Sequence, residues 1–71
     1  MYEKHLLIYE MLLYEYISLN GDKNKYLKVE TIINKYSEYE IEKMWKNILD
    51  DIYEIKRQNK IETLKKWIQK N

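Results

Sequence analysis

The sequence predicts a compact all-α domain of three to four helices that covers residues 1–71 as a single unit. Three observations lead to this prediction. Apolar residues recur at helical spacing through most of the chain, there is no proline and one glycine, and a serine followed three residues later by glutamate marks a helix start.

Residues 2–19 predict the first helix, with apolar side chains on nearly every side of it. Such a helix has to be surrounded, either by the rest of the chain or by a second copy. We expect Asn20-Gly21 to end it, with Gly21 in the left-handed conformation. An Asn-Gly pair also marks β-hairpins and residues 14–19 alternate weakly, so a strand over 14–19 is the alternative.

Residues 28–36 predict a short helix of two or three turns, and the main helix follows over residues 37–55. We expect Ser37 to cap it, by accepting a hydrogen bond from the N–H of Glu40 while the Glu40 carboxylate accepts one from the N–H of Ser37. The apolar stripe of this helix consists of Ile41, Met44, Trp45, Ile48, Leu49, Ile52 and Ile55.

The apolar pattern changes face after Ile55. At about 100° per residue, Ile61, Leu64 and Ile68 fall roughly opposite the earlier stripe. Either the chain breaks near Gln58-Asn59, or the helix continues and its far side packs against something else.

The middle of the chain resembles the helical core of winged-helix and helix-turn-helix proteins, over residues 26–53. The resemblance rests on Tyr26-Leu27-Lys28-Val29-Glu30, the short helix after it, the abrupt Tyr36-Ser37 junction and the amphipathic helix that follows. It implies that the two helices are locked together by Ile32, Ile33, Tyr36, Ile41 and Trp45. It also allows a degenerate wing hairpin over Ile52–Leu64, although the usual turn glycine is absent.

In that family the outer face of the second helix contacts DNA, and here that face is rich in carboxylates. Residues 37–55 carry a net charge of −4 and residues 56–71 a net charge of +5. Carboxylates are repelled by phosphates, so the resemblance supports the architecture more than a DNA-binding activity. Any nucleic acid would instead meet the basic C-terminal segment, through Lys56, Arg57, Lys60, Lys65 and Lys66.

The residues form no catalytic or metal-binding pattern. His5 is the single histidine, and no serine, cysteine or second histidine lies near it in sequence. The carboxylate pairs Glu38/Glu42 and Asp50/Glu54 point outward and lack the histidines of a helical metal site. We therefore expect no enzyme, no cofactor, no metal and no small-molecule substrate.

The composition excludes other classes. There are no cysteines, which rules out disulfides and fits a reducing compartment. The most apolar window, residues 2–19, carries four charged residues, so we expect a cytoplasmic chain and no membrane. Lys, Ile, Tyr and Asn supply 36 of the 71 residues, a bias towards AT-rich codons that many bacterial mobile elements and viruses share.

The sequence favours a non-enzymatic binding or regulatory module that acts through protein–protein interaction as a homodimer. A chain of this length has a small core, and a second subunit is a common source of additional stability. The expected interface residues are Tyr9, Leu12, Tyr16, Leu64, Trp67 and Ile68. The alternative is a dimeric DNA-binding regulator of helix-turn-helix type, and a third possibility is a structural protein that only assembles with itself.

Overall fold

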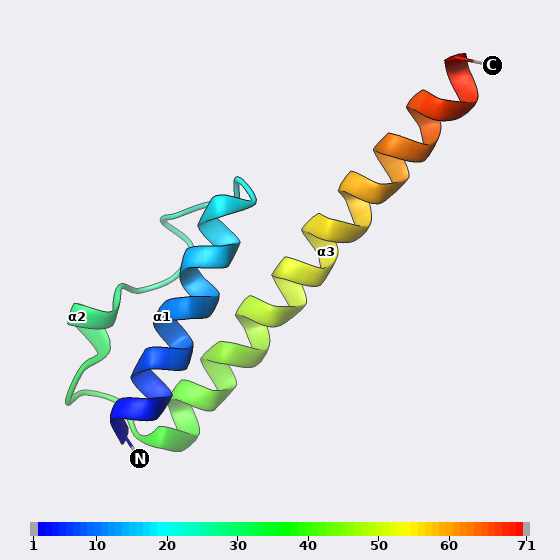
Figure 1. The fold of residues 1–71 in the computed structure, drawn as a ribbon. Coiled ribbons are helices and arrows are strands. Elements are labelled where there is room, and N and C mark those ends of the chain that lie inside the picture. The colour runs from blue at the N-terminus through cyan, green and yellow to red at the C-terminus, as the bar shows by residue number, and fades with distance from the viewer. Residues whose placement is uncertain (1, 71) are drawn as a thin grey trace.

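The structure, a computed structural model, describes residues 2–70 as three helices and no strand (Figure 1). They are α1 (Tyr2–Ser18), α2 (Val29–Ile32) and α3 (Glu38–Lys70). The all-α prediction is confirmed. The alternative of a strand over residues 14–19 and that of a wing hairpin over Ile52–Leu64 are both wrong, because α1 and α3 run through these segments.

The two long helices lie side by side and run in the same direction (Figure 1). Both begin at the lower end of the molecule in that view, so residues 19–37 have to return the chain along the helical pair before α3 can start. The return segment contains α2. A parallel pair of helices therefore needs a long crossover, which itself covers one side of the core.

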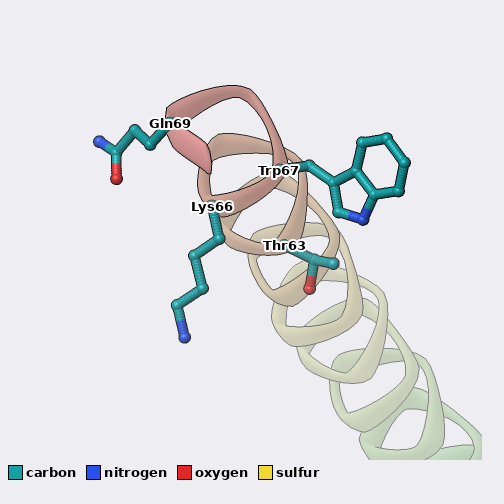
Figure 2. Close-up of a pocket in the computed structure, with 4 residues that line it drawn as sticks. All are labelled: Thr63, Lys66, Trp67 and Gln69. Atoms are coloured by element: carbon teal, nitrogen blue, oxygen red, sulfur yellow. The ribbon is translucent and has the colours of Figure 1, made fainter. Parts of the chain in front are cut away.

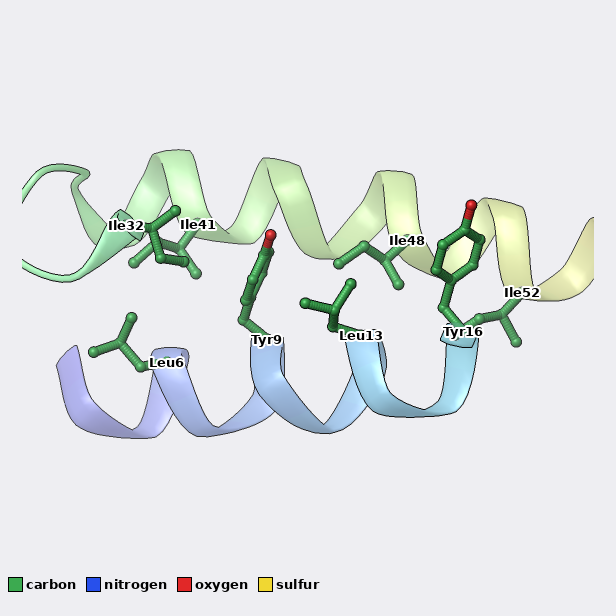
Figure 3. Close-up of a cluster of buried hydrophobic side chains, with 8 residues drawn as sticks. All are labelled: Leu6, Tyr9, Leu13, Tyr16, Ile32, Ile41, Ile48 and Ile52. Atoms are coloured by element: carbon green, nitrogen blue, oxygen red, sulfur yellow. The ribbon is translucent and has the colours of Figure 1, made fainter. Parts of the chain in front are cut away.

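The core lies between α1 and α3 and is closed by one residue of α2 (Figure 3). Side chains from α1 and α3 point towards one another across the gap between the helices. Buried residues are Leu6, Tyr9, Leu13 and Tyr16 from α1, Ile32 from α2, and Ile41, Ile48 and Ile52 from α3. Burying a large apolar side chain completely contributes about 1.5–3 kcal/mol to the free energy of folding. The core is small, because few residues are buried in it.

Two of the buried tyrosines also hold the crossover in place. The hydroxyl of Tyr9 donates a hydrogen bond to the carbonyl of Leu27 at 2.5 Å, and the hydroxyl of Tyr16 accepts one from the N–H of Asp22 at 2.9 Å. Burial raises the pKa of Tyr9 above its ordinary value, with a smaller contribution from Tyr36. The core face of α1 thus supplies both apolar area and polar anchors.

The end of α1 departs from the expected glycine conformation. Asn20, with a φ of 67°, takes the left-handed conformation, and Gly21 has no positive φ. The N–H of Gly21 bonds the carbonyl of Tyr16 and the N–H of Asn20 bonds that of Ile17, which is a Schellman motif with Asn20 after the helix. Gly21 is needed for another reason: a Cβ there would overlap the Tyr16 ring.

The middle helix is shorter than the predicted two or three turns. It ends at Ile32, since Ile33 has an extended ψ of 131° and Asn34 a left-handed φ of 62°. The N–H of Asn34 then donates to the hydroxyl of Tyr2 at 2.9 Å instead of continuing a helix. A contact with the start of α1 therefore sets the length of α2.

The start of α3 agrees with the prediction. The N–H of Glu40 donates to Oγ of Ser37 at 3.2 Å, and the N–H of Ser37 donates to Oε1 of Glu40 at 3.1 Å, so both halves of the capping box are present. Beyond the core α3 continues without a break at Gln58-Asn59. The chain extends over 54 Å and has a radius of gyration of 15.4 Å, against about 11 Å for a compact domain of this length.

Replacing Gly21 by alanine should destabilise the protein, because the new methyl group forces the buried Tyr16 ring to move. We expect a loss of about 1–3 kcal/mol in the free energy of unfolding, the usual cost of overpacking. Urea denaturation followed by circular dichroism measures this loss. Asn20→Gly is the matched control and should be close to neutral, because glycine also accepts a positive φ. Equal stability of Gly21→Ala and wild type would contradict the assigned packing.

Candidate protein-interaction surfaces

One exposed apolar stripe runs along α1 outside its buried face. Its members recur at intervals of four, three and three residues, which keeps them on one side of the helix over about 15 Å. We call this set the α1 stripe: Leu7, Met11, Tyr14 and Ile17. Their exposed fractions are 57%, 63%, 76% and 42%. Exposed apolar side chains along one side of a helix make this stripe a candidate interaction surface.

A shallow hollow of about 150 Å³ adjoins the α1 stripe where α1 meets the start of α2. It is lined by Glu10, Leu13, Tyr14, Ile17, Lys28, Val29 and Glu30. Apolar walls with charged groups at the rim suit the side chain of a protein partner better than a small polar metabolite.

A second apolar set lies on the projecting part of α3. Every residue from Lys56 to Gln69 is exposed, and the tail stripe, defined as Ile61, Leu64, Trp67 and Ile68, is uncovered. A hollow beside Thr63, Lys66, Trp67 and Gln69 has side chains of a single helix as its lining (Figure 2). Trp67 and Lys66 point to different sides there, so the hollow has no second wall to enclose a ligand.

Part of the predicted interface is exposed in the structure. Leu64, Trp67 and Ile68 are exposed on the tail, as an interface requires. Tyr9 and Tyr16 are 0% and 4% exposed in the chain's own core, so these two positions are corrected: they do not face a partner. Leu12 is half-buried against the same core.

The α1 stripe is the part of the surface that the sequence did not single out. Leu6, Tyr9, Leu13 and Tyr16 follow a helical pattern, and the α1 stripe follows a similar pattern that starts one residue later. Hydrophobicity therefore gives no reason to choose between the two faces. The choice is made by contacts distant in sequence, such as the bond from Tyr9 to Leu27.

The basic residues predicted for nucleic acid are all exposed. Lys56 forms an ion pair with Glu15 at 3.0 Å, near the end of the packed region. The five cations Lys56, Arg57, Lys60, Lys65 and Lys66 lie at positions that point around the whole circumference of α3. They do not form one continuous basic face.

The helix-turn-helix resemblance names five residues that would lock two helices together. Ile32 and Ile41 are buried in the core, and Tyr36 and Trp45 pack against it. Ile33 is 44% exposed and does not join them.

A charged cluster ties the crossover to α3. The Nζ of Lys25 lies 2.7 Å from Oδ2 of Asp51, and the hydroxyl of Tyr26 donates a hydrogen bond to the same oxygen. The hydrogen bond from Lys25, followed by that from Tyr26, holds the pKa of Asp51 below its ordinary value. Burial and the bond to Asp51 raise the pKa of Tyr26. These contacts fix the crossover to α3.

His5 takes part in a contact between α1 and α3. Its ring stacks on Trp45 with the centroids 4.9 Å apart, and its Nε2 lies 2.9 Å from Oε1 of Glu42. The indole Nε1 of Trp45 donates to the carbonyl of His5 at 3.1 Å.

Metal clusters and membrane spans are both absent from the described residues, 2–70. Within that range no three histidine, cysteine or acidic side chains come together as a metal site would require. None of the described helices combines the length and the apolar character needed to cross a membrane.

No known protein family, curated protein or solved structure matches this chain. Its own surfaces are therefore the basis for assigning a function.

Replacing Asp51 by asparagine should lower the free energy of unfolding at neutral pH by about 0.2–1 kcal/mol, the range for exposed ion pairs. A carboxyl group with a lowered pKa in the folded state stabilises the fold above its unfolded pKa of 3.8. This stabilisation is lost as the pH falls through the folded pKa. Wild type and variant should thus differ at pH 7 and converge below pH 3.8 in urea titrations. Asp50→Asn, a change in the exposed neighbouring residue, is the control; a destabilisation as large as that of Asp51→Asn would contradict the assignment.

Proposed function

We propose that this protein is a small non-enzymatic binding module that acts through protein–protein interaction. The α1 stripe carries the proposal: four large apolar side chains stand exposed along one helix face, beside a hollow rimmed by Glu10, Lys28 and Glu30. Apolar residues at the centre and charges at the rim are the usual arrangement of a protein interface.

The geometry favours a helix or extended segment of a target protein. The stripe is about 15 Å long, which is close to three helical turns, and a partner helix presents apolar anchors at the same spacing. Met11 at the centre of the stripe is flexible and adapts to irregular partner surfaces. Tyr14 provides an aromatic anchor of the type that dominates interface energies.

A photo-crosslinking residue in place of Met11 tests the proposal directly. In extracts of the source cells it should capture a defined protein, and the amount captured should not change after nuclease treatment. Adding Tyr14→Glu should reduce capture strongly, because a carboxylate would then have to be buried at the contact. Both positions are exposed, so circular dichroism should show an unchanged fold.

The same photo-crosslinking residue in place of Tyr39 is the matched control. Tyr39 is 65% exposed but lies at the start of α3, outside the α1 stripe. Capture of the same proteins from both positions, or capture that nuclease abolishes, would count against a protein target for the α1 stripe.

DNA binding by the tail is the second candidate function. One observation favours it: the basic segment from Lys56 to Gln69 projects as an exposed helix, so its cations are accessible to phosphates. Against it stand the distribution of these cations around the helix and the carboxylates of the preceding turns.

We expect only weak binding to random duplex DNA, with a dissociation constant no better than about 10⁻⁴ M at physiological salt. Fluorescence anisotropy with labelled duplexes at several salt concentrations measures this. The comparison variant replaces five cations by glutamine: Lys56, Arg57, Lys60, Lys65 and Lys66. Two results together would establish the DNA-binding alternative. Wild type would bind tightly, with an affinity that falls steeply with salt, and the variant would flatten the salt slope by nearly one unit for each cation bound to a phosphate.

A further inference from the structure

We propose that the projecting part of α3 pairs with α3 of a second copy in antiparallel orientation. The apolar residues involved form two groups on α3, outside its buried stripe. Leu49 and Tyr53 lie beside the core and are 37% and 72% exposed. The tail stripe, Ile61, Leu64, Trp67 and Ile68, begins about two turns beyond Tyr53. Basic residues separate the two groups.

The charge along α3 selects the orientation. The helix changes from a net charge of −4 over residues 37–55 to +5 over residues 56–71. Parallel pairing would place the basic segment of one copy against that of the other, with Lys65 facing Lys65. Antiparallel pairing places the outer part of each basic segment, residues 62–70, along residues 47–55 of the partner, which removes the contact between the two Lys65 side chains.

One antiparallel register brings apolar residues together as well. With Tyr53 opposite Leu64 of the second copy, Leu49 lies at the level of its Trp67 and Ile68. Lys65 of the second copy then lies between Asp50 and Glu54, on the same edge of the helix. Symmetry repeats each of these contacts.

The centre of this pairing is the least favourable part. Arg57 and Lys60 of the two copies meet there. Their long side chains can extend to the edges of the helix pair, where the charged ends stay in solvent. Apolar contacts at both ends of the pairing thus flank a polar centre. The two-fold symmetric contact closes on itself and predicts dimers without larger assemblies.

The available area is sufficient for a stable pair. Six apolar side chains of each copy take part, twelve in all, and they have to bury about 80 Å² on average for the interface to reach the ~1,000 Å² that a specific complex requires. All six are exposed in the single chain. The α1 stripe stays outside this interface, so a dimer leaves the proposed target surface free.

Engineered cysteines test both the pairing and its direction, because the natural chain has none. A disulfide forms only where Cβ atoms come within about 4.5 Å. A mixture of Tyr53→Cys and Leu64→Cys proteins should cross-link several-fold more than either protein alone. Leu64→Cys mixed with Thr31→Cys is the control, since Thr31 is exposed in α2, far from the proposed contact.

Light scattering supplies the second measurement. Wild type at about 100 µM should have twice the chain mass of 8.9 kDa, and the exposed substitution Leu64→Glu should return it to a monomer whose core of α1 and α3 still unfolds cooperatively. A monomeric wild type, cross-linking no greater than the control, or cross-linking mainly within the Tyr53→Cys or the Leu64→Cys protein alone would overturn the proposal. None of these results bears on capture through Met11, which tests the proposed target surface separately.

Discussion

The parallel direction of α1 and α3 is the constraint on which the rest of the structure depends. Because both helices start at the same end, the crossover has to run back along the pair. Its apolar residues, with Ile32 fully buried, pack against the core, and hydrogen bonds add to these contacts. The hydroxyls of Tyr9 and Tyr16 bond the crossover from α1, and Asp51 holds Lys25 and Tyr26 from α3. Tyrosine suits this role, because its side chain is apolar along its length and polar at the tip; Tyr2, Tyr9, Tyr16 and Tyr26 all serve in this way.

The same anchors explain which parts of the fold could be predicted. The start of α3 is local, since Ser37 and Glu40 bond one another across three residues, and the stripe through Ile41, Ile48 and Ile52 follows from periodicity alone. The length of α2 is not local. It depends on the bond between Asn34 and Tyr2, thirty-two residues apart, which no helical pattern contains.

Of the two exposed apolar stripes, one could be predicted from the sequence pattern and the other could not. The tail stripe could be predicted, because a change of helical face after Ile55 leaves those residues without a place in the core of their own chain. The α1 stripe could not be chosen, because a helix that is apolar on nearly every side has no preferred face until α3 packs against one of them. The role of Gly21 could not be predicted either. It leaves room for the Tyr16 ring, and the sequence pattern does not specify where that ring lies.

The projecting part of α3 is a helix held at one end only. All fourteen residues from Lys56 to Gln69 are exposed, the ion pair of Lys56 ties the first of them to α1, and isolated helices of this length are marginal in water. Its helical conformation therefore depends on the packed turns around Ile52, from which it continues. Any molecule that binds the tail has to supply the free energy of ordering its last turns. The intrinsic helix propensity of exposed positions such as Asn59 and Thr63 thus contributes to the affinity for such a molecule, even where these residues do not touch it.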